Sequence, residues 1–188
     1  RGFSFKQWRN INFAINSKNV KPFQNLIKSK SLSLIKDFNF YYLPKMLSFR
    51  TDMYREYQSR LLRNKSEALI ILEPSVTKVW DWNRIYDLRY DVTQSLKLDY
   101  NANVNAFVLE PPGAFDKNND NYQDYRDSVK TSIMNFGSIR RFNQSANINY
   151  QIPFSKIGLL NWLSANVRYG AIYRWEASAT SLQPRFGN

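Results

Sequence analysis

Residues 162–176 read WLSANVRYGAIYRWE, and this stretch decides the fold class. Every odd position from 163 to 175 is apolar, whereas the even positions are mostly polar. Such alternation is typical of a β-strand, because successive side chains of a strand point to opposite faces. A helical period of 3.6 residues would mix the two classes. The stretch therefore predicts one long strand with an apolar and a polar face.

Six further stretches alternate in the same way, with interruptions such as Arg84 and Ile85. The predicted strands cover residues 2–16, 35–42, 46–58, 79–91, 95–107, 143–152 and 162–176. Most of them are longer than the roughly 5–6 residues usual in globular proteins. A strand that crosses a bilayer at a tilt needs about 9–11 residues, so these lengths favour a transmembrane barrel.

The predicted connections alternate in length along the chain. The long loops are 17–34, 59–78 and 109–142, the short ones are 43–45 and 92–94, and 153–161 is intermediate. Outer-membrane barrels combine short turns at one end with long loops at the other, and they leave no free edge in lipid. Seven strands cannot close such a barrel. We therefore predict an all-β fold in which residues 1–188 form an arc of antiparallel strands from one very large transmembrane outer-membrane β-barrel.

The two faces of this arc have different predicted surroundings. Asparagine is a poor strand former that needs water or polar partners, so an Asn-rich face favours a wide aqueous lumen. The predicted lumen-lining residues are Arg50, Asp52, Glu56, Asp81, Asp87, Arg89, Lys97, Asp99, Asn101, Asn103, Asn105, Asn147, Asn149, Asn166 and Arg168. The predicted lipid-facing residues are Leu96, Leu98, Tyr100, Val104, Leu163, Val167, Tyr169, Tyr173 and Trp175.

Large aromatic residues lie near the ends of the predicted strands. Trp80, Trp82, Tyr173 and Trp175 are examples, whereas mid-strand positions carry smaller residues such as Ala102. This order favours an interfacial girdle at the depth of the lipid head groups. The alternative is the core of a soluble sandwich, although a core would place large residues at mid-strand.

The charge of the chain is uneven. Lys and Arg number 27 against 15 Asp and Glu, for a net charge of +12. Residues 1–65 hold 14 basic and 3 acidic residues, a net +11, and the remainder holds 13 and 12, a net +1. A basic segment suits nucleic acid, anionic lipid or an acidic neighbour. Because Asp52 and Glu56 interrupt the basic and aromatic run near residues 54–57, we expect no nucleic-acid partner.

The composition argues against covalent chemistry. The chain has no Cys and no His, which excludes thiol nucleophiles, disulfides and every triad that needs an imidazole base. Carboxylate pairs such as Asp87 and Asp91 are interpreted as lumen charges rather than an acid–base dyad. We predict a transporter that is not an enzyme, with no catalytic residues, metal site or cofactor. Because the chain begins at Arg1 without Met or a leader, we interpret it as processed or as part of a longer protein.

Four strings of the sequence resemble a known family. They are DFNFYYLPKMLSFRTDMYREYQSRLLRN at 37–64, VWDWNRIYDLRYDVTQSLKLDYNANVNAF at 79–107, EPPG at 110–113 and NWLSANVRYGAIYRW at 161–175. They resemble the SprA/Sov family, the outer-membrane translocon of the type 9 secretion system in Bacteroidetes-type bacteria.

The resemblance implies a giant single-chain barrel in the cell outer membrane that passes folded cargo proteins to the cell surface and is linked to gliding motility. Its implied partners are outer-membrane lipid, secreted cargo, a smaller shuttle barrel and a periplasmic plug protein. Two alternatives stay open. One is another large outer-membrane transporter or porin, and the other is a soluble carbohydrate- or nucleic-acid-binding β-domain.

Overall fold

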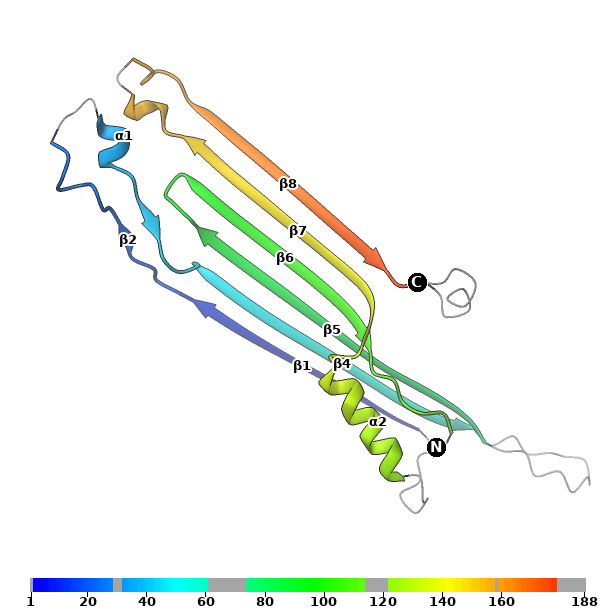
Figure 1. Ribbon diagram of the computed structural model, residues 1–188. Coiled ribbons are helices and arrows are strands. Elements are labelled where there is room, and N and C mark those ends of the chain that lie inside the picture. The colour runs from blue at the N-terminus through cyan, green and yellow to red at the C-terminus, as the bar shows by residue number, and fades with distance from the viewer. Residues whose placement is uncertain (1, 29–31, 61–73, 114–121, 158, 179–188) are drawn as a thin grey trace, which may run out of the picture.

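Six antiparallel strands form one open sheet, in the order β1-β4-β5-β6-β7-β8 (Figure 1). The computed structural model describes residues 2–28, 32–60, 74–113, 122–157 and 159–178. The strands are β1 (Gly2–Ala14), β4 (Met46–Arg60), β5 (Ser75–Asp91), β6 (Leu96–Phe107), β7 (Ser138–Ile152) and β8 (Ala165–Glu176). Each pairs with the next along this order, so the sheet is a meander. The predicted all-β class is confirmed.

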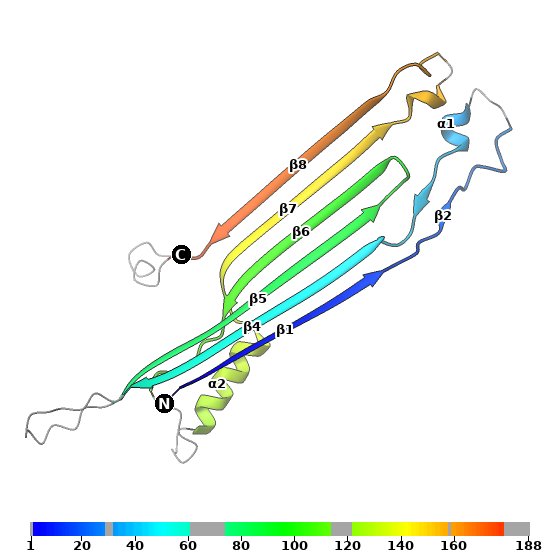
Figure 2. The ribbon, with the colours of Figure 1, turned by 180° about the vertical axis from the view of Figure 1, so that it is seen from behind.

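The connections gather at the two ends of the sheet. One end, called the turn end below, carries the tight β5–β6 turn at residues 92–95, together with the β1–β4 and β7–β8 connections (Figures 1 and 2). The other end, called the cap end, carries the segment between β6 and β7 with helix α2 (Tyr122–Met134). Residues 61–73 and 114–121 of the predicted long loops lie outside the described residues.

The predicted strand at 35–42 is wrong. Helix α1 (Ser33–Lys36) occupies its beginning, and only β3 (Phe40–Tyr41) pairs, in a separate two-stranded sheet with β2 (Asn19–Val20). The buried side chain of Asn39 explains this, because its Oδ1 accepts from Gln94 N at 2.8 Å and its Nδ2 donates to Asp37 O at 3.0 Å. The segment is thereby tied across the β5–β6 turn instead of entering the main sheet.

This correction changes the loop arrangement. Without a strand at 35–42, the predicted long loop 17–34 and the short connection 43–45 merge into one β1–β4 connection at the turn end. The expected strict alternation of long and short loops is therefore also wrong. The other predicted strands exist with shifted bounds, the largest shifts being the earlier starts of β5 and β7 and the later start of β8.

Buried apolar side chains gather at the cap end. They are Trp82, Ala102, Val104, Ala106 and Val108. The register shifts between Asn105 and Ala106, where Arg140 is an extra residue in β7, and such a bulge bends the strand that carries it. Figures 1 and 2 agree in placing α2 on one face of the sheet near this end. Much of the remaining sheet surface is open, and large hydrophobic side chains stay exposed on β1 and β8.

Candidate functional site: two faces and two open edges

The register assigns the predicted lumen-lining residues to one face. Paired residues share a face, so Arg89, Asp99 and Asn147 lie in one row across β5, β6 and β7. Following the rows from β4 to β8 places all the predicted lumen-lining residues on this side, called the polar face. The side-chain partition is thus as expected, and the assignment to a lumen stays a prediction.

Some polar side chains of this face contact one another. Asn101 Nδ2 donates to Asp87 Oδ1 at 2.5 Å, and Arg50 Nε lies 3.1 Å from Asp52 Oδ2. These contacts are exposed, so each contributes little to stability. The polar face is an accessible surface of mixed charged and amide groups.

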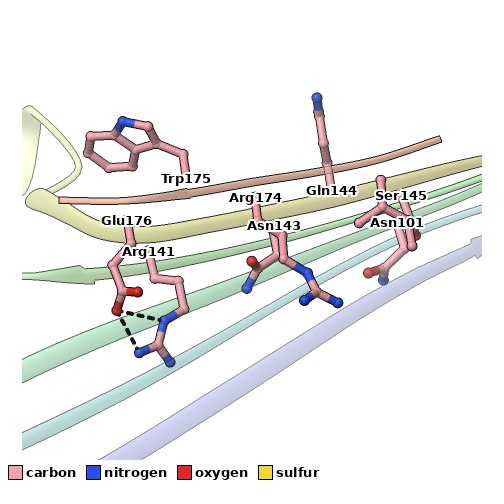
Figure 3. Close-up of a pocket in the computed structure, with 9 residues that line it drawn as sticks. Asn101, Arg141, Asn143, Gln144, Ser145, Arg174, Trp175 and Glu176 are labelled. Atoms are coloured by element: carbon pink, nitrogen blue, oxygen red, sulfur yellow. Dashed lines mark hydrogen bonds and ion pairs between the residues drawn. The ribbon is translucent and has the colours of Figure 1, made fainter.

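A groove of about 730 Å³ crosses the polar face over β6, β7 and β8. Figure 3 shows Asn101, Asn143 and Arg174 on the same side of the strands, and Gln144 and Trp175 on the other. Arg141 Nη2 contacts Glu176 Oε1 at 2.9 Å, so the one carboxylate of the groove is paired. The lining offers amide and guanidinium groups, and it does not bring a nucleophile next to a general base.

The opposite side, called the apolar face, carries Leu98, Ile148 and Tyr169 in one row. Two predicted lipid-facing residues require correction. Val104 is only 7% exposed, in the row that contains buried Arg84, so it is not offered to lipid. Leu163 precedes β8 and belongs to a turn in which its N–H bonds Leu160 O. The other predicted lipid-facing residues lie on the apolar face, namely Leu96, Leu98, Tyr100, Val167, Tyr169, Tyr173 and Trp175.

A cap covers the apolar face at the cap end. It consists of the described residues 108–113 and 122–137, and the sequence reasoning missed it. Phe136 stacks on Trp82 with ring centroids 6.0 Å apart, and the guanidinium of Arg84 lies 5.3 Å from the Phe136 ring and 4.9 Å from that of Trp82. Arg84 is 5% exposed. The interruption of the alternation at Arg84 therefore corresponds to a buried cation that contacts two stacked aromatic rings.

Glu110 anchors the other part of the cap. Its Oε1 lies 2.7 Å from Arg55 Nε, as an ion pair without the alignment of a hydrogen bond, and its Oε2 accepts from the Tyr125 hydroxyl at 3.0 Å. Lys78 Nζ donates to Pro111 O at 2.7 Å and lies 4.9 Å from the Tyr125 ring centroid. Burial, followed by the charge of Glu110, raises the pKa of Tyr125 to about 12.

The backbone at the end of α2 is shaped for this docking. Phe136 has a φ of 61° and Gly137 a φ of 71°. A Cβ on Gly137 would lie 2.8 Å from Phe107 O, so only glycine fits at this approach. Gly137 N donates to Ser132 O at 2.8 Å, a bond typical of a helix end closed by left-handed residues. This end of α2 brings Phe136 over the sheet.

Both edges of the sheet are open. Among the described residues, β1 pairs only with β4 and β8 pairs only with β7, so each has one row of backbone groups without a strand partner. Large exposed hydrophobic residues accompany both edges: Phe3, Phe5, Trp8, Ile11 and Phe13 on β1, and Val167, Tyr169, Ile172, Tyr173 and Trp175 on β8. Long edges of this composition are aggregation hazards unless other strands cover them.

No protein-family model and no curated protein matches this chain. Among the helices of the described residues, none has the length and apolar content required to span a membrane. Acidic side chains in the described part of the chain form no group of three or more that could hold a metal ion.

Proposed function

We propose that this chain is a segment of the wall of a large protein-conducting β-barrel in the cell outer membrane, of the type 9 secretion translocon kind. Its polar face lines an aqueous channel and its apolar face meets lipid. The observation that carries the proposal is an open sheet of long strands, with faces of opposite polarity and with both edges unpaired in the part of the chain that the structure describes.

The open edges favour a larger structure over a free-standing one. A backbone N–H or C=O without a partner in lipid costs several kcal/mol, so a spanning sheet must continue until it closes. β1 has 13 residues and β8 has 12, which makes two long rows of unpaired groups. Further strands on both sides would satisfy these rows and cover the exposed side chains of the edges.

The strand lengths agree with a tilted crossing. The twelve residues of β8 extend about 40 Å at roughly 3.3 Å per residue, enough for a hydrocarbon core of about 30 Å at the tilt of barrel strands. The apolar-face residues of β8 carry no charge from Ala165 to Trp175, so its whole length suits lipid. The cap occupies the apolar face at one end of β5 and β6, and we assign it to the aqueous side of the membrane.

The translocon is preferred over a porin for two reasons. The quoted strings resemble the SprA/Sov family, and the wide polar face with amide-rich rows suits the passage of folded protein without tight binding. The shuttle barrel, the plug protein and the cargo are partners that this proposal inherits from the resemblance. Deletion of the protein is therefore expected to leave cargo in the periplasm and to abolish gliding.

Adjacent residues of β8 test the face assignment. Val167 is 51% exposed and lies on the apolar face, and Arg168, which is also exposed, lies on the polar face. In a cysteine-free full-length background in cells, Arg168→Cys should react with a membrane-impermeant maleimide and Val167→Cys should not. Both should react after solubilisation and denaturation, which controls for expression.

The outcome separates the alternatives. Equal reaction of both thiols in cells would contradict a lipid-facing apolar side and favour a soluble β-domain. Protection of Val167→Cys together with unimpaired secretion in the deletion strain would keep the barrel and favour another outer-membrane transporter or a porin.

A further inference from the structure

An apolar crevice of about 690 Å³ lies at the turn end, between α1 and the β7–β8 connection. Its apolar lining is formed by Leu34, Phe38, Leu96, Tyr150, Ile152 and Ile157. Leu96 and Tyr150 are paired across β6 and β7 on the apolar face, so the sheet itself forms one wall. A volume of this size is within the range of sites for small apolar ligands.

The other walls are held in place by specific contacts. Ser33 Oγ, at the start of α1, donates to Lys156 O at 2.5 Å. Lys156 Nζ lies 3.4 Å from Asp37 Oδ2. The Asn39 bonds described above tie the same segment to the β5–β6 turn. The crevice is thus built between two connections that are far apart in the sequence.

The connections at the turn end are both apolar and basic. Leu159 and Trp162 are strongly exposed in the β7–β8 connection, which follows Ile157 of the crevice lining. The described parts of residues 15–45 and 153–163 contain six Lys and one Asp; Lys30 lies outside the described residues. They are Lys18, Lys21, Lys28, Lys36, Lys45, Lys156 and Asp37. Exposed aromatic rings next to lysines are typical of segments at the head-group level of a membrane.

The crevice is continuous with the exposed apolar face. Tyr150 is 38% exposed and pairs with exposed Val167 of β8, and the next row holds Ile148 and Tyr169. An acyl chain that runs along this face would pass directly into the crevice, with its head group at the lysines beyond the strand ends. An apolar face that ends at a set of lysines matches the acyl chain and the phosphate of an anionic phospholipid.

We propose that the crevice binds an anionic phospholipid, with an acyl chain against Tyr150 and Ile152 and the phosphate at Lys156. This site rests on the proposed function, because it requires lipid at the apolar face. Lys156 lines the crevice and its side chain is partly exposed, so its charge can serve both Asp37 and a phosphate.

Photocrosslinking tests the site in the full-length protein. The photoreactive residue p-benzoylphenylalanine replaces Tyr150, and the protein is placed in vesicles of nine parts phosphatidylcholine to one part phosphatidylglycerol. The comparison position is Tyr173, which also lies exposed on the apolar face but about 20 Å further along β8 than Val167. Mass spectrometry then identifies the lipid attached at each position.

We expect phosphatidylglycerol at position 150 about fivefold above its share of the vesicle, and at position 173 in proportion to its share. Lys156→Gln should bring position 150 down to that share. Asp37→Asn is the matched control, since it also breaks the ion pair but keeps the Lys156 charge, and enrichment should persist.

Every other result contradicts the lipid site. The combination of adducts at positions 150 and 173 shows whether the proposed function is contradicted as well. If phosphatidylglycerol is attached at both positions only in proportion to its share of the vesicle, the sheet faces lipid but the crevice does not select an anionic lipid. A protein adduct at position 150 with lipid at position 173 makes the crevice a protein-docking surface. Absence of lipid at both positions contradicts the lipid-facing sheet as well.

Discussion

Trp82 and Trp175 occupy the same face of the sheet in opposite environments. Trp82, on β5 at the cap end, is 9% exposed beneath the cap, whereas Trp175, on the edge strand β8, is 44% exposed. In the sequence, both tryptophans occupy apolar positions of an alternating stretch. Alternation therefore determines which face a side chain occupies, whereas the β6–β7 segment, by folding over one end of the sheet, determines which of these side chains is covered.

The charges that β4, β5 and β8 carry on the apolar face follow the same division. Arg55, Lys78 and Arg84 of β4 and β5 lie on this face, and each contacts the cap through Glu110, Pro111, Tyr125 or Phe136. Over its paired length, the apolar side of β8 carries no charged residue. The capped region therefore resembles the interior of a soluble protein, and the β8 region resembles a surface that meets hydrocarbon.

The largest expected effect is that of replacing the buried tryptophan. Trp82→Ala removes the ring that packs on Phe136, so we expect a loss of about 3–5 kcal/mol in the free energy of unfolding. Trp175→Ala should lose less than about 1 kcal/mol in detergent, because its ring is already largely exposed. Urea titrations of the purified full-length protein measure both. Similar losses would contradict the difference between the two regions.

Breaking the Arg55–Glu110 pair comes next. The Glu110 side chain is 4% exposed, so Glu110→Gln leaves Arg55 without its counter-charge. Because the Arg55 side chain is 26% exposed and keeps some contact with solvent, the expected cost is about 2–3 kcal/mol, below the roughly 3–5 kcal/mol of a fully buried pair. Glu176→Gln breaks the exposed pair with Arg141 and should cost less than about 1 kcal/mol. Unfolding titrations compare the two variants. A larger loss for Glu176→Gln would refute the buried character of the cap.

Gly137→Ala should loosen the cap without unfolding the sheet. The new Cβ would meet Phe107 O, and alanine is strained at a φ of 71°, so we expect a cost of about 1–3 kcal/mol. Hydrogen exchange should speed up in residues 122–137 and stay unchanged in β8. Gly170→Ala is the control, because its Cβ approaches only the movable side chain of Asn147. Protection of residues 122–137 equal to that of the unmodified protein would show that the approach is not tight.

The smallest effect is a dependence on alkaline pH. The pKa of Tyr125 is raised to about 12 from an ordinary 10, so its contribution is complete below pH 10 and is lost as the pH rises through 12. We expect hydrogen exchange of α2 to accelerate within this window. Tyr125→Phe has no hydroxyl to ionise and should lose that part of the acceleration. An unchanged pH profile in the variant would exclude Tyr125 as its source.

Much of the sheet could be predicted from the sequence, because the period of two is a local property of the backbone. It identified six of the strands and placed residues as far apart as Arg50, Asn101 and Arg168 on one face. It failed at residues 35–42. In that segment a few alternating aromatic residues have the pattern of a strand. The hydrogen bonds of the Asn39 side chain, one of which reaches the β5–β6 turn, could not be predicted from the alternation of neighbouring residues.

Only the tertiary structure decided what the apolar face contacts. Val104 and Val167 have the same apolar character, yet one is buried and the other is half-exposed, because the β6–β7 segment folds back over one end of the sheet. Arg84 is a local indication of this cover, because it is a charged residue in a row of apolar residues on β5 and its neighbours. Its partner Phe136 lies more than 50 positions away in the chain. Side-chain alternation is set by neighbouring residues, whereas coverage is set by contacts between distant ones, so the sequence pattern alone could not distinguish them.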